Sequence, residues 1–330
     1  MPGKRSKPSP QKSSKQNELT LAEKLQVIKA STEGSSVAYL RPETAQSIFV
    51  NFKNVMSSNR VKIPFGIAQI GKAFRNEITP KQFLFRMREF EQMEMEWFCT
   101  EQDAPRFFKE WCAIRMEFYT QIGIDPSRIR LRAHENDELS HYSRGTSDVE
   151  YEFPFGWKEL EGIANRGDYD LKRHSEFSGK DLAVHDEETK ESYFPNVVET
   201  SVGTDRLFLT LLFDSYKEDV IEGETRAVLS LHPSLAPYCA AFMPLSKKIG
   251  EPLEALYKDL KSKGYSVQYD ESGSIGKRYR RQDEVGTPLC FTYDFESEAT
   301  NSVTVRDRDS MTQKRISIDQ IETYIKDTVR

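Results

Sequence analysis

Three arginines and a phenylalanine lie close together in the sequence on one predicted hairpin. Arg75 follows a strand-like run, and Arg86, Arg88 and Phe90 lie on the run that returns after the turn. A guanidinium group can bind two phosphate oxygens at once, so this grouping predicts a site for a phosphorylated ligand. The ring of Phe90 offers a flat face for a base. A solvated charged hairpin is the alternative, but the core-forming aromatic residues around these arginines argue against it.

A fourth arginine, Arg206, follows Gly203 in the first turn of a predicted helix. The helix dipole makes this end of a helix unfavourable for a cation. Arg206 is therefore expected to have an anionic partner, either a phosphate group or an acidic side chain.

The strand predicted over residues 90–98 alternates between polar and apolar side chains. Period two sends the two sets to opposite faces of a sheet. The sets are Gln92, Glu94 and Glu96 on one face and Met93, Met95 and Trp97 on the other. This pattern predicts a sheet with one packed face and one face that lines a polar cleft. We expect Glu94 to be functional rather than a surface carboxylate.

Around these segments, residues 37–231 read as one domain of strands and helices. Strands are predicted at residues 62–74, 90–98, 129–133, 149–155 and 197–201, and helices from Asp103 and over residues 206–216. The buried side of the first helix is expected to include Phe107, Trp111, Ile114 and Phe118. Because the strands follow one another through loops and hairpins, the predicted fold is an α+β core with a mainly antiparallel sheet flanked by helices.

A Pro-rich linker at residues 232–237 begins a second domain, residues 232–330, in which strands and helices alternate. Strands are predicted at residues 239–245, 265–269, 289–295, 302–306 and 314–318, and helices at 251–263, 274–284 and from Asp319. This order implies right-handed crossovers and an α/β domain with a mostly parallel, five-stranded sheet.

Composition excludes some classes of protein. No run of about eighteen apolar residues occurs, so the sequence predicts no membrane span. The net charge of −5 does not indicate a nucleic-acid-binding protein, although local basic patches can still bind phosphate. The cysteines are scattered without a C-x-x-C pair, which predicts neither a zinc site nor a disulfide framework. A reduced, cytoplasmic compartment fits best, with the mitochondrion as the alternative.

The N-terminal residues 1–36 differ from the rest of the chain. The first seventeen are basic, contain no acidic residue and are dominated by Ser and Pro, which predicts a disordered tail. A capping-box pattern that starts at Thr20 predicts a short helix after it.

Several long segments together resemble the class II aminoacyl-tRNA synthetase core, and specifically the family of dimeric glycyl-tRNA synthetases. Arg75-Asn76-Glu77 with the returning strand resembles motif 2, and Glu199 to Arg206 resembles motif 3. The segments RPETAQ (41–46), REFEQMEME (88–96), GWKELEGIANRGDYDL (156–171) and GKRYRRQDEVGTPLC (276–290) match that family. The resemblance runs from about Val37 to the C-terminus. No counterpart of motif 1 precedes it, so an N-terminally truncated synthetase is expected.

The resemblance implies a ligase that couples glycine to ATP with Mg²⁺ and then to tRNA(Gly), in a protein whose family forms homodimers. Its catalytic residues would be Arg75 and Arg206. The implied ATP-binding residues are Arg75, Asn76, Glu77, Phe85, Arg86, Arg88, Phe90, Glu159, Leu160, Glu199, Gly203 and Arg206. The implied glycine-binding residues are Glu43, Gln92, Glu94, Glu199, Ser201 and Gly203. Glu159 and Glu199 would hold Mg²⁺, and Lys277, Arg278, Arg280 and Arg281 would contact tRNA.

A second hypothesis is a synthetase-like protein that binds nucleic acid without catalysis. Such a protein has no use for Arg75, Glu77, Glu94, Glu199 and Arg206 together, so the sequence favours the enzyme.

Overall fold

The computed structural model describes residues 39–80, 83–135, 137–140, 143–187, 189–221 and 223–329. The chain divides into two units, Met1–Arg41 and Pro42–Arg330, and only residues 39–41 of the first are described. The predicted tail and the helix expected at Thr20 lie outside the described residues.

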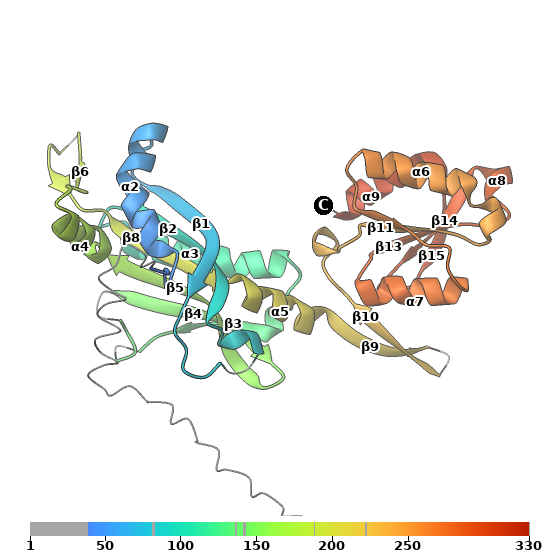
Figure 1. Cartoon of the computed structure of the whole chain (residues 1–330), viewed down its shortest axis with the longest axis horizontal. Coiled ribbons are helices and arrows are strands. Elements are labelled where there is room, and N and C mark those ends of the chain that lie inside the picture. The colour runs from blue at the N-terminus through green and yellow to red at the C-terminus, as the bar shows by residue number, and fades with distance from the viewer. Residues whose placement is uncertain are drawn as a thin grey trace, which may run out of the picture. The chain divides into compact units, whose positions relative to one another are not determined.

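A six-stranded sheet forms the centre of the first part of this unit (Figure 1). Its strand order is β1-β2-β8-β5-β4-β3, and every neighbouring pair is antiparallel. The strands are β1 (Phe65–Phe74), β2 (Glu89–Cys99), β3 (Ile129–Ala133), β4 (Gly145–Phe153), β5 (Gly156–Gly167) and β8 (Asn196–Gly203). The predicted antiparallel core is therefore confirmed.

Helices cover both faces of this sheet. On one face, Phe49 and Phe52 of α2 and Leu171 of α4 pack with Phe98. On the other face, Trp97 makes edge contacts with the α3 residues Phe107 and Trp111. The helices are α2 (Ala45–Asn59), α3 (Ala104–Gln121), α4 (Tyr169–Ser178) and α5 (Thr204–Ser215), with short 3-10 turns η1 (Phe83–Phe85) and η2 (Pro126–Arg128). Two small hairpins complete this part, β6 (Val184–His185) with β7 (Ser192–Tyr193) and β9 (Tyr216–Ile221) with β10 (Glu224–Leu229).

One expectation for α3 is wrong. Ile114 is 47% exposed instead of buried. The buried stripe of the helix passes through Cys112 and Tyr119, and Arg115 between them reaches the buried carboxylate of Glu161. Ile114 precedes Arg115 by one position and so points about 100° away from the stripe.

The C-terminal domain has a second sheet, in the order β12-β11-β13-β14-β15. β11 is parallel to β12 and β13, whereas β14 is antiparallel to both β13 and β15, so four of the five strands point the same way. The mostly parallel sheet is therefore confirmed. Its strands are β11 (Ala240–Pro244), β12 (Val267–Tyr269), β13 (Leu289–Tyr293), β14 (Ser302–Asp307) and β15 (Gln313–Ser317).

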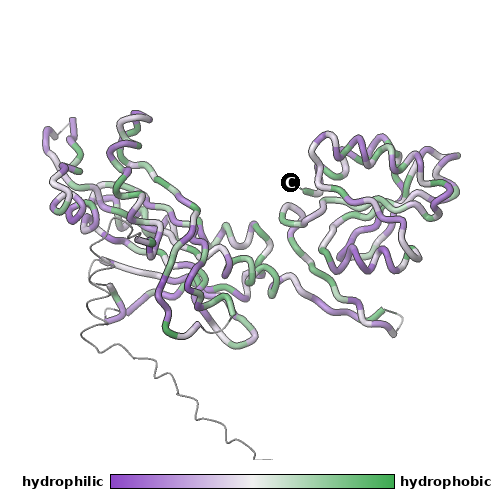
Figure 2. The backbone as a smooth tube through the Cα atoms, viewed as in Figure 1, coloured by the Kyte–Doolittle hydropathy of each residue, from purple (hydrophilic) through white to green (hydrophobic). Residues whose placement is uncertain are grey.

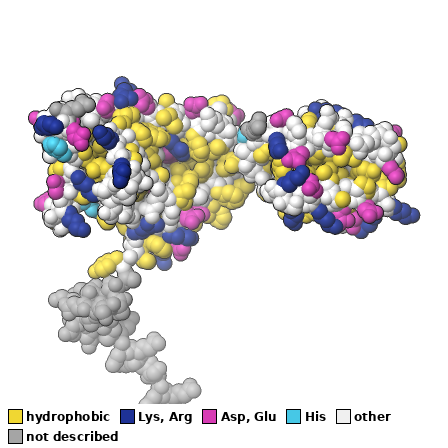
Figure 3. Space-filling model, turned by 90° about the horizontal axis from the view of Figure 1, so that it is seen from above, with side chains coloured by type: hydrophobic (Ala, Val, Ile, Leu, Met, Phe, Trp, Pro, Cys, Tyr) yellow, Lys and Arg dark blue, Asp and Glu magenta, His cyan; other side chains and the backbone are white. Residues whose placement is uncertain are grey.

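Helices sandwich this second sheet. Leu260 of α6 and Ile325 of α9 pack on one face with Phe291, and Ile275 and Tyr279 of α7 pack on the other. The central strands are hydrophobic while the helices carry hydrophilic stretches (Figure 2). Charged side chains of both signs are interspersed on the outside of this domain (Figure 3). The helices are α6 (Glu251–Ser262), α7 (Ile275–Val285), α8 (Ser297–Thr300) and α9 (Ile321–Val329), with turns η3 (Pro233–Leu235), η4 (Lys247–Ile249) and η5 (Ile318–Gln320).

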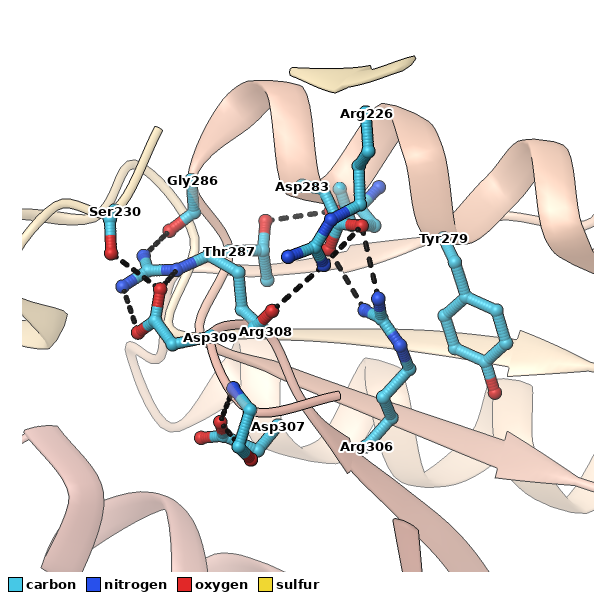
Figure 4. Close-up of polar contacts among 12 residues, drawn as sticks. Arg226, Ser230, Tyr279, Asp283, Gly286, Thr287, Arg306, Asp307, Arg308 and Asp309 are labelled. Carbon is cyan, nitrogen blue, oxygen red and sulfur yellow. Dashed lines mark hydrogen bonds and ion pairs between the residues drawn. The ribbon is translucent and has the colours of Figure 1, made fainter. Parts of the chain in front are cut away.

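A buried cluster of charged residues connects the β9–β10 hairpin to the C-terminal domain (Figure 4). Asp283 of α7 is 1% exposed and accepts two bonds from Arg306, at 2.8 and 3.1 Å. It also accepts a bond of 3.3 Å from Arg226 of β10, whose guanidinium is held on its other side by Asp219. Arg308, which is 2% exposed, donates to the carbonyl oxygens of Gly286 and Leu231. These bonds satisfy guanidinium groups that burial would otherwise destabilise.

The four cysteines Cys99, Cys112, Cys239 and Cys290 are buried, free thiols. Burial raises the pKa of Cys99 and of Cys290 to about 12 and that of Cys112 to about 11. Within the described residues, none of the helices has the length and apolar character needed to cross a membrane.

Candidate active site

A pocket of about 280 Å³ lies on the face of the first sheet that α2 and α4 cover, over β2, β5 and β8. It brings together almost all of the residues that were predicted to bind ATP or glycine. The predicted residues that line it are Glu43, Arg75, Glu77, Phe85, Arg86, Phe90, Gln92, Glu94, Glu159, Leu160, Glu199, Ser201, Gly203 and Arg206. Asn76 and Arg88 do not line it.

Strand pairing explains how distant residues meet in this pocket. Glu94 of β2 lies opposite Ser201 of β8, and Gln92 lies opposite Gly203. Because side chains alternate along a strand, residues of like parity share one face. Period two therefore directs Gln92, Glu94 and Ser201 into the same cavity.

Glu94 has a full set of hydrogen-bond donors. One carboxylate oxygen accepts from the backbone N–H of Thr44 at 2.9 Å and from the Thr44 hydroxyl. The other accepts from the Ser201 hydroxyl at 3.0 Å and from the Gln92 amide at 3.2 Å. With 3% of its surface exposed, Glu94 is not a surface carboxylate.

The polar face of β2 is the more deeply buried one. Glu94 and Glu96 are 3% and 0% exposed, whereas Met93 and Met95 are only partly buried. The alternation predicted the two faces correctly, but the face with the acidic residues also carries α2 and α4. This end of the pocket is therefore a buried acidic site and not an open polar cleft.

Glu199 adds a second buried carboxylate near Glu94. Burial raises its pKa to about 7, the Arg166 guanidinium opposes this rise, and the charge of Glu94 adds to it. Arg166 donates to Glu199 and also to Asp170, at 2.8 and 2.9 Å. Burial alone would lower the pKa of Arg166, but its hydrogen bonds to the Asp170 carboxylate and the charge of Glu199 outweigh burial and raise it. A cationic group on a ligand would relieve the excess of negative charge here.

Two arginines mark the opposite end of the pocket. Arg75 donates to the carbonyl oxygen of Pro42 at 3.2 Å, and its guanidinium lies 5.3 Å from the centre of the Phe90 ring. Arg206 donates to the carbonyl oxygen of Glu159 at 2.7 Å and lies 3.5 Å from the Glu159 carboxylate. The expected anionic partner of Arg206 is thus present as an acidic side chain.

The pKa of Arg206 reveals crowding of positive charge. Burial lowers it, the Glu159 carboxylate opposes this, and the guanidinium of Arg75 lowers it further. Two cations that raise each other's energy in a partly dry pocket favour a bound anion between them.

Arg88 has a different role from its two neighbours in the hairpin. Its side chain donates to the carbonyl oxygen of Glu77 at 2.9 Å, and its own carbonyl accepts from the N–H of Arg75 at 3.0 Å. Of the three arginines expected to converge, Arg75 and Arg86 line the pocket, and Arg88 closes the hairpin that presents Arg75.

The predicted Mg²⁺ pair does not fit one ion. Ala164 is the residue opposite Glu199, and Glu159 precedes it on the same strand by 164 − 159 = 5 positions. At about 3.3 Å per residue, the two Cα atoms are roughly 16 Å apart, whereas Mg²⁺ needs ligand oxygens at about 2.1 Å. Among the residues described, no group of three or more His, Cys, Asp or Glu could hold a metal. A single ion would therefore not contact both carboxylates directly, and the expectation that Glu159 and Glu199 hold Mg²⁺ stays a prediction.

The predicted tRNA-contacting residues of α7 divide into two kinds. Lys277 is exposed, and Arg281 is half-exposed and paired with Asp270 at 2.6 Å. Arg280 is more sheltered and lies 3.9 Å from Glu224. Arg278 is 4% exposed and donates to the carbonyl oxygens of Pro244 and Gly273, so it holds the start of α7 in place. The expectation that Arg278 contacts tRNA is contradicted by this burial.

Several residues of the site had not been predicted. Thr44 donates to Glu94, Arg166 donates to Glu199, and Asp170 accepts from Arg166. Glu96 on the same strand as Glu94 is fully buried. Within the described structure neither carboxylate oxygen of Glu96 has a hydrogen-bond partner. Burial and the charge of Glu199 raise its pKa well above the usual range. One signal in the sequence could have identified Thr44 and Arg166, because both lie inside segments that match the glycyl-tRNA synthetase family.

Comparison with known proteins agrees with this geometry. The model of the tRNA synthetase class II core domain (G, H, P, S and T) matches residues 28–216, more than half of the chain. The chain belongs to the class II tRNA synthetase core family. The anticodon binding domain model matches residues 240–328 of the chain, which cover the second sheet and its helices.

Individual proteins with known names are similar to this chain over most of its length. The chain is 55% identical over 298 residues to the glycine–tRNA ligase of Caldanaerobacter subterraneus subsp. tengcongensis, covering 90% of this chain and 64% of that protein. It is 57% identical to the glycine–tRNA ligase of Geobacillus thermodenitrificans, covering 87% and 62%. It thus spans less than two thirds of the length of these relatives.

A solved structure shows the same fold. The prolyl-tRNA synthetase of Cryptosporidium parvum, complexed with L-proline and AMP, matches 90% of this chain and 62% of its own, with a TM-score of 0.65 and 18% sequence identity. At this identity the likeness concerns the fold alone.

Proposed function

We propose that this chain is a glycine–tRNA ligase that activates glycine with ATP and transfers the glycyl group to the 3′ end of tRNA(Gly). The observation that carries the proposal is the two-ended pocket. Glu94, Glu199 and Ser201 form an acidic end that suits an ammonium group, and Arg75 and Arg206 form a basic end that suits phosphate. The names of the relatives at 55% and 57% identity support it.

The chemistry needs positioning and not a general base. The glycine carboxylate is already an anion, and one of its oxygens attacks the α-phosphorus of ATP. A new P–O bond forms, the bond to the β-phosphate bridging oxygen breaks, and pyrophosphate leaves with that electron pair. Arg75 would bind the carboxylate and the α-phosphate together, and Arg206 the far end of the triphosphate. Phe90 would stack on adenine.

Class II synthetases use ATP together with a divalent metal ion, and Mg²⁺ would supply charge neutralisation on the phosphates. This chain offers Glu159 and Glu199 too far apart to share an ion. Glu159, which is half-exposed at the phosphate end, is the better placed of the two.

Selectivity for glycine would be steric. Glu94, Ser201 and Gln92 hydrogen-bond one another, so little room remains beside an ammonium group held there. Every competing amino acid is larger than glycine, so a sieve by size discriminates well.

The domain roles follow from the same proposal. Residues 37–231 would form the catalytic core, and residues 232–330 would bind the anticodon region, with Lys277, Arg280 and Arg281 as contacts. The family's homodimer is expected for this chain as well.

Glycine-dependent exchange of pyrophosphate into ATP on the purified chain tests the proposal. Exchange that requires glycine, and that alanine or serine does not support, would agree with it. A folded chain that binds tRNA but gives no exchange would instead favour the alternative of a synthetase-like nucleic-acid-binding protein.

A Glu94→Gln variant should raise the glycine KM by about 10- to 100-fold, because it removes the negative charge that attracts the ammonium group in a buried site. The ATP KM should stay the same, since Glu94 lies at the acidic end. A similar rise in both KM values would contradict this assignment.

The glycine KM should also depend on pH. The pKa of Glu199 is raised to about 7, so this carboxyl gains a proton as the pH falls below that value and no longer attracts an ammonium group. We expect the glycine KM to rise between pH 8 and pH 6, and the pH profile of Glu199→Gln to be flat in this range. A wild-type profile that is equally flat would show that Glu199 does not bind the ammonium.

A further inference from the structure

Two residues of helix α4 are connected by hydrogen bonds to the acidic end of the pocket, each through one intervening residue. Asp170 and His174 are four positions apart, which places them one above the other on the same face of the helix. Neither lines the pocket. Each is bonded to a residue that in turn holds one of the pocket's carboxylates.

The first connection runs through Arg166. Asp170 accepts two bonds from this guanidinium, at 2.8 and 2.9 Å, and the third nitrogen donates to Glu199. Asp170 is 5% and Arg166 5% exposed. Because the two bonds to Asp170 fix the planar guanidinium, its third nitrogen points to the Glu199 carboxylate in a defined direction.

The second connection runs through Gln46. Its amide nitrogen donates to Glu43 at 2.8 Å, and its amide oxygen lies 2.6 Å from Nε2 of His174. Since an amide oxygen only accepts, His174 must carry its proton on Nε2. The imidazole also packs against Phe49, with 5.8 Å between the ring centres, and Phe49 is fully buried. His174 therefore fixes which way Gln46 points and so which atom faces Glu43.

Glu43 is the pocket residue that most needs such support. It is half-buried and precedes α2, where its backbone is outside regular structure. Glu94, by comparison, has four donors of its own. A carboxylate on a loop becomes a precise ligand only if other groups restrict its rotamers.

We propose that His174 is a positioning residue for the amino-acid site, acting on Glu43 through Gln46, and that α4 thereby orients two of the carboxylates that receive the ammonium group. This inference rests on the proposed function and adds to it residues outside the pocket. Its effect is confined to the amino-acid substrate, because neither connection reaches Arg75 or Arg206.

The test compares KM values in pyrophosphate exchange for His174→Phe, Gln46→Leu and the double variant. Phenylalanine keeps a ring against Phe49 but removes the N–H donor. The loss of one neutral hydrogen bond, worth about 1 kcal/mol, should raise the glycine KM about fivefold and leave the ATP KM unchanged. The double variant should be no worse than Gln46→Leu alone, because His174 acts only through Gln46.

Arg173→Gln is the matched control. Arg173 adjoins His174 on α4, but its guanidinium pairs with Glu176 and stacks on Phe177. It should leave both KM values unchanged. If His174→Phe lowers the thermal midpoint yet leaves the glycine KM at the control value, the residue is merely structural and the inference is overturned. The inference is also overturned if the increases in glycine KM caused by His174→Phe and by Gln46→Leu add together in the double variant.

A readout without catalysis separates this inference from the proposed function. In ¹⁵N NMR spectra, His174 should show a protected Nε2–H signal that shifts in Gln46→Leu and in Glu43→Gln but not in Arg173→Gln. If the Nε2–H signal is protected but the chain gives no glycine-dependent exchange, the proposed function and the role of His174 in glycine binding are overturned, while the hydrogen bonds from His174 through Gln46 to Glu43 stand. If the unaltered chain gives exchange but His174 shows no protected signal, those hydrogen bonds alone are overturned.

Discussion

An Arg75→Ala variant is expected to fold normally and to lose glycine-dependent pyrophosphate exchange by a factor of about 10²–10³, the usual effect of removing one preorganised donor to a developing charge. Its side chain is exposed and, among the residues that the structure describes, donates to the carbonyl oxygen of Pro42, so folding depends little on it. Catalysis depends on it more, because Arg75 is one of the arginines that line the phosphate end of the pocket. The loss should fall on kcat, since the charge on the α-phosphate is greatest in the transition state.

The control for Arg75→Ala is Arg106→Ala on α3. Arg106 is also an exposed arginine, paired with Asp103 and Glu110 on the helix surface. Its removal should change neither the exchange rate nor, by more than about 1 kcal/mol, the stability. If Arg75→Ala retains more than a tenth of the exchange rate, Arg75 is not the residue that stabilises the α-phosphate.

Replacement of Asp283 by Ala should destabilise the C-terminal domain by about 3–5 kcal/mol, because a buried charge left without its partner is costly. Arg306 would lose both of its hydrogen bonds to the Asp283 carboxylate and keep its contact with the face of the Tyr279 ring, 4.9 Å away. Arg226 would lose one acceptor but keep Asp219 and the carbonyl oxygen of Arg308. The urea midpoint of the transition assigned to this domain measures the effect.

Glu254→Ala is the comparison for Asp283→Ala. Glu254 forms an exposed i,i+4 pair with Lys258 on α6, which should contribute no more than about 0.5 kcal/mol. A loss in Asp283→Ala as small as that of Glu254→Ala would show that water replaces the missing carboxylate. The cluster would then be open to solvent in solution.

Patterns within one strand or helix were readily predicted from the sequence. Alternation along residues 90–98 assigned Glu94 to the correct face, and the order of strands and helices gave both sheets. The depth of burial was not predictable in this way, because it depends on what packs on the face. Glu94 and Glu96 are covered by α2 and α4, whose placement the strand itself does not encode.

Contacts between distant residues account for most of what was missed. Gln46 and His174 are separated by 128 positions and Arg166 and Glu199 by 33, so no local spacing relates them. Arg278 shows why exposure cannot be predicted from a run of charged residues. Its neighbour Lys277 faces solvent, yet the Arg278 side chain turns inward to the carbonyl oxygens of Pro244 and Gly273. Ile114 was predicted wrongly because the buried stripe of α3 passes through Cys112 and Tyr119, which the packing of the helix decides.

The four buried thiols make this chain convenient for site-directed labelling. Maleimides and spin labels react with the thiolate, and burial keeps the pKa of Cys99, Cys112 and Cys290 at about 11 to 12. A cysteine introduced at an exposed position such as Lys277 would therefore be the one that reacts, with no native cysteine replaced. A probe there would report whether RNA approaches α7, by a signal that requires no turnover.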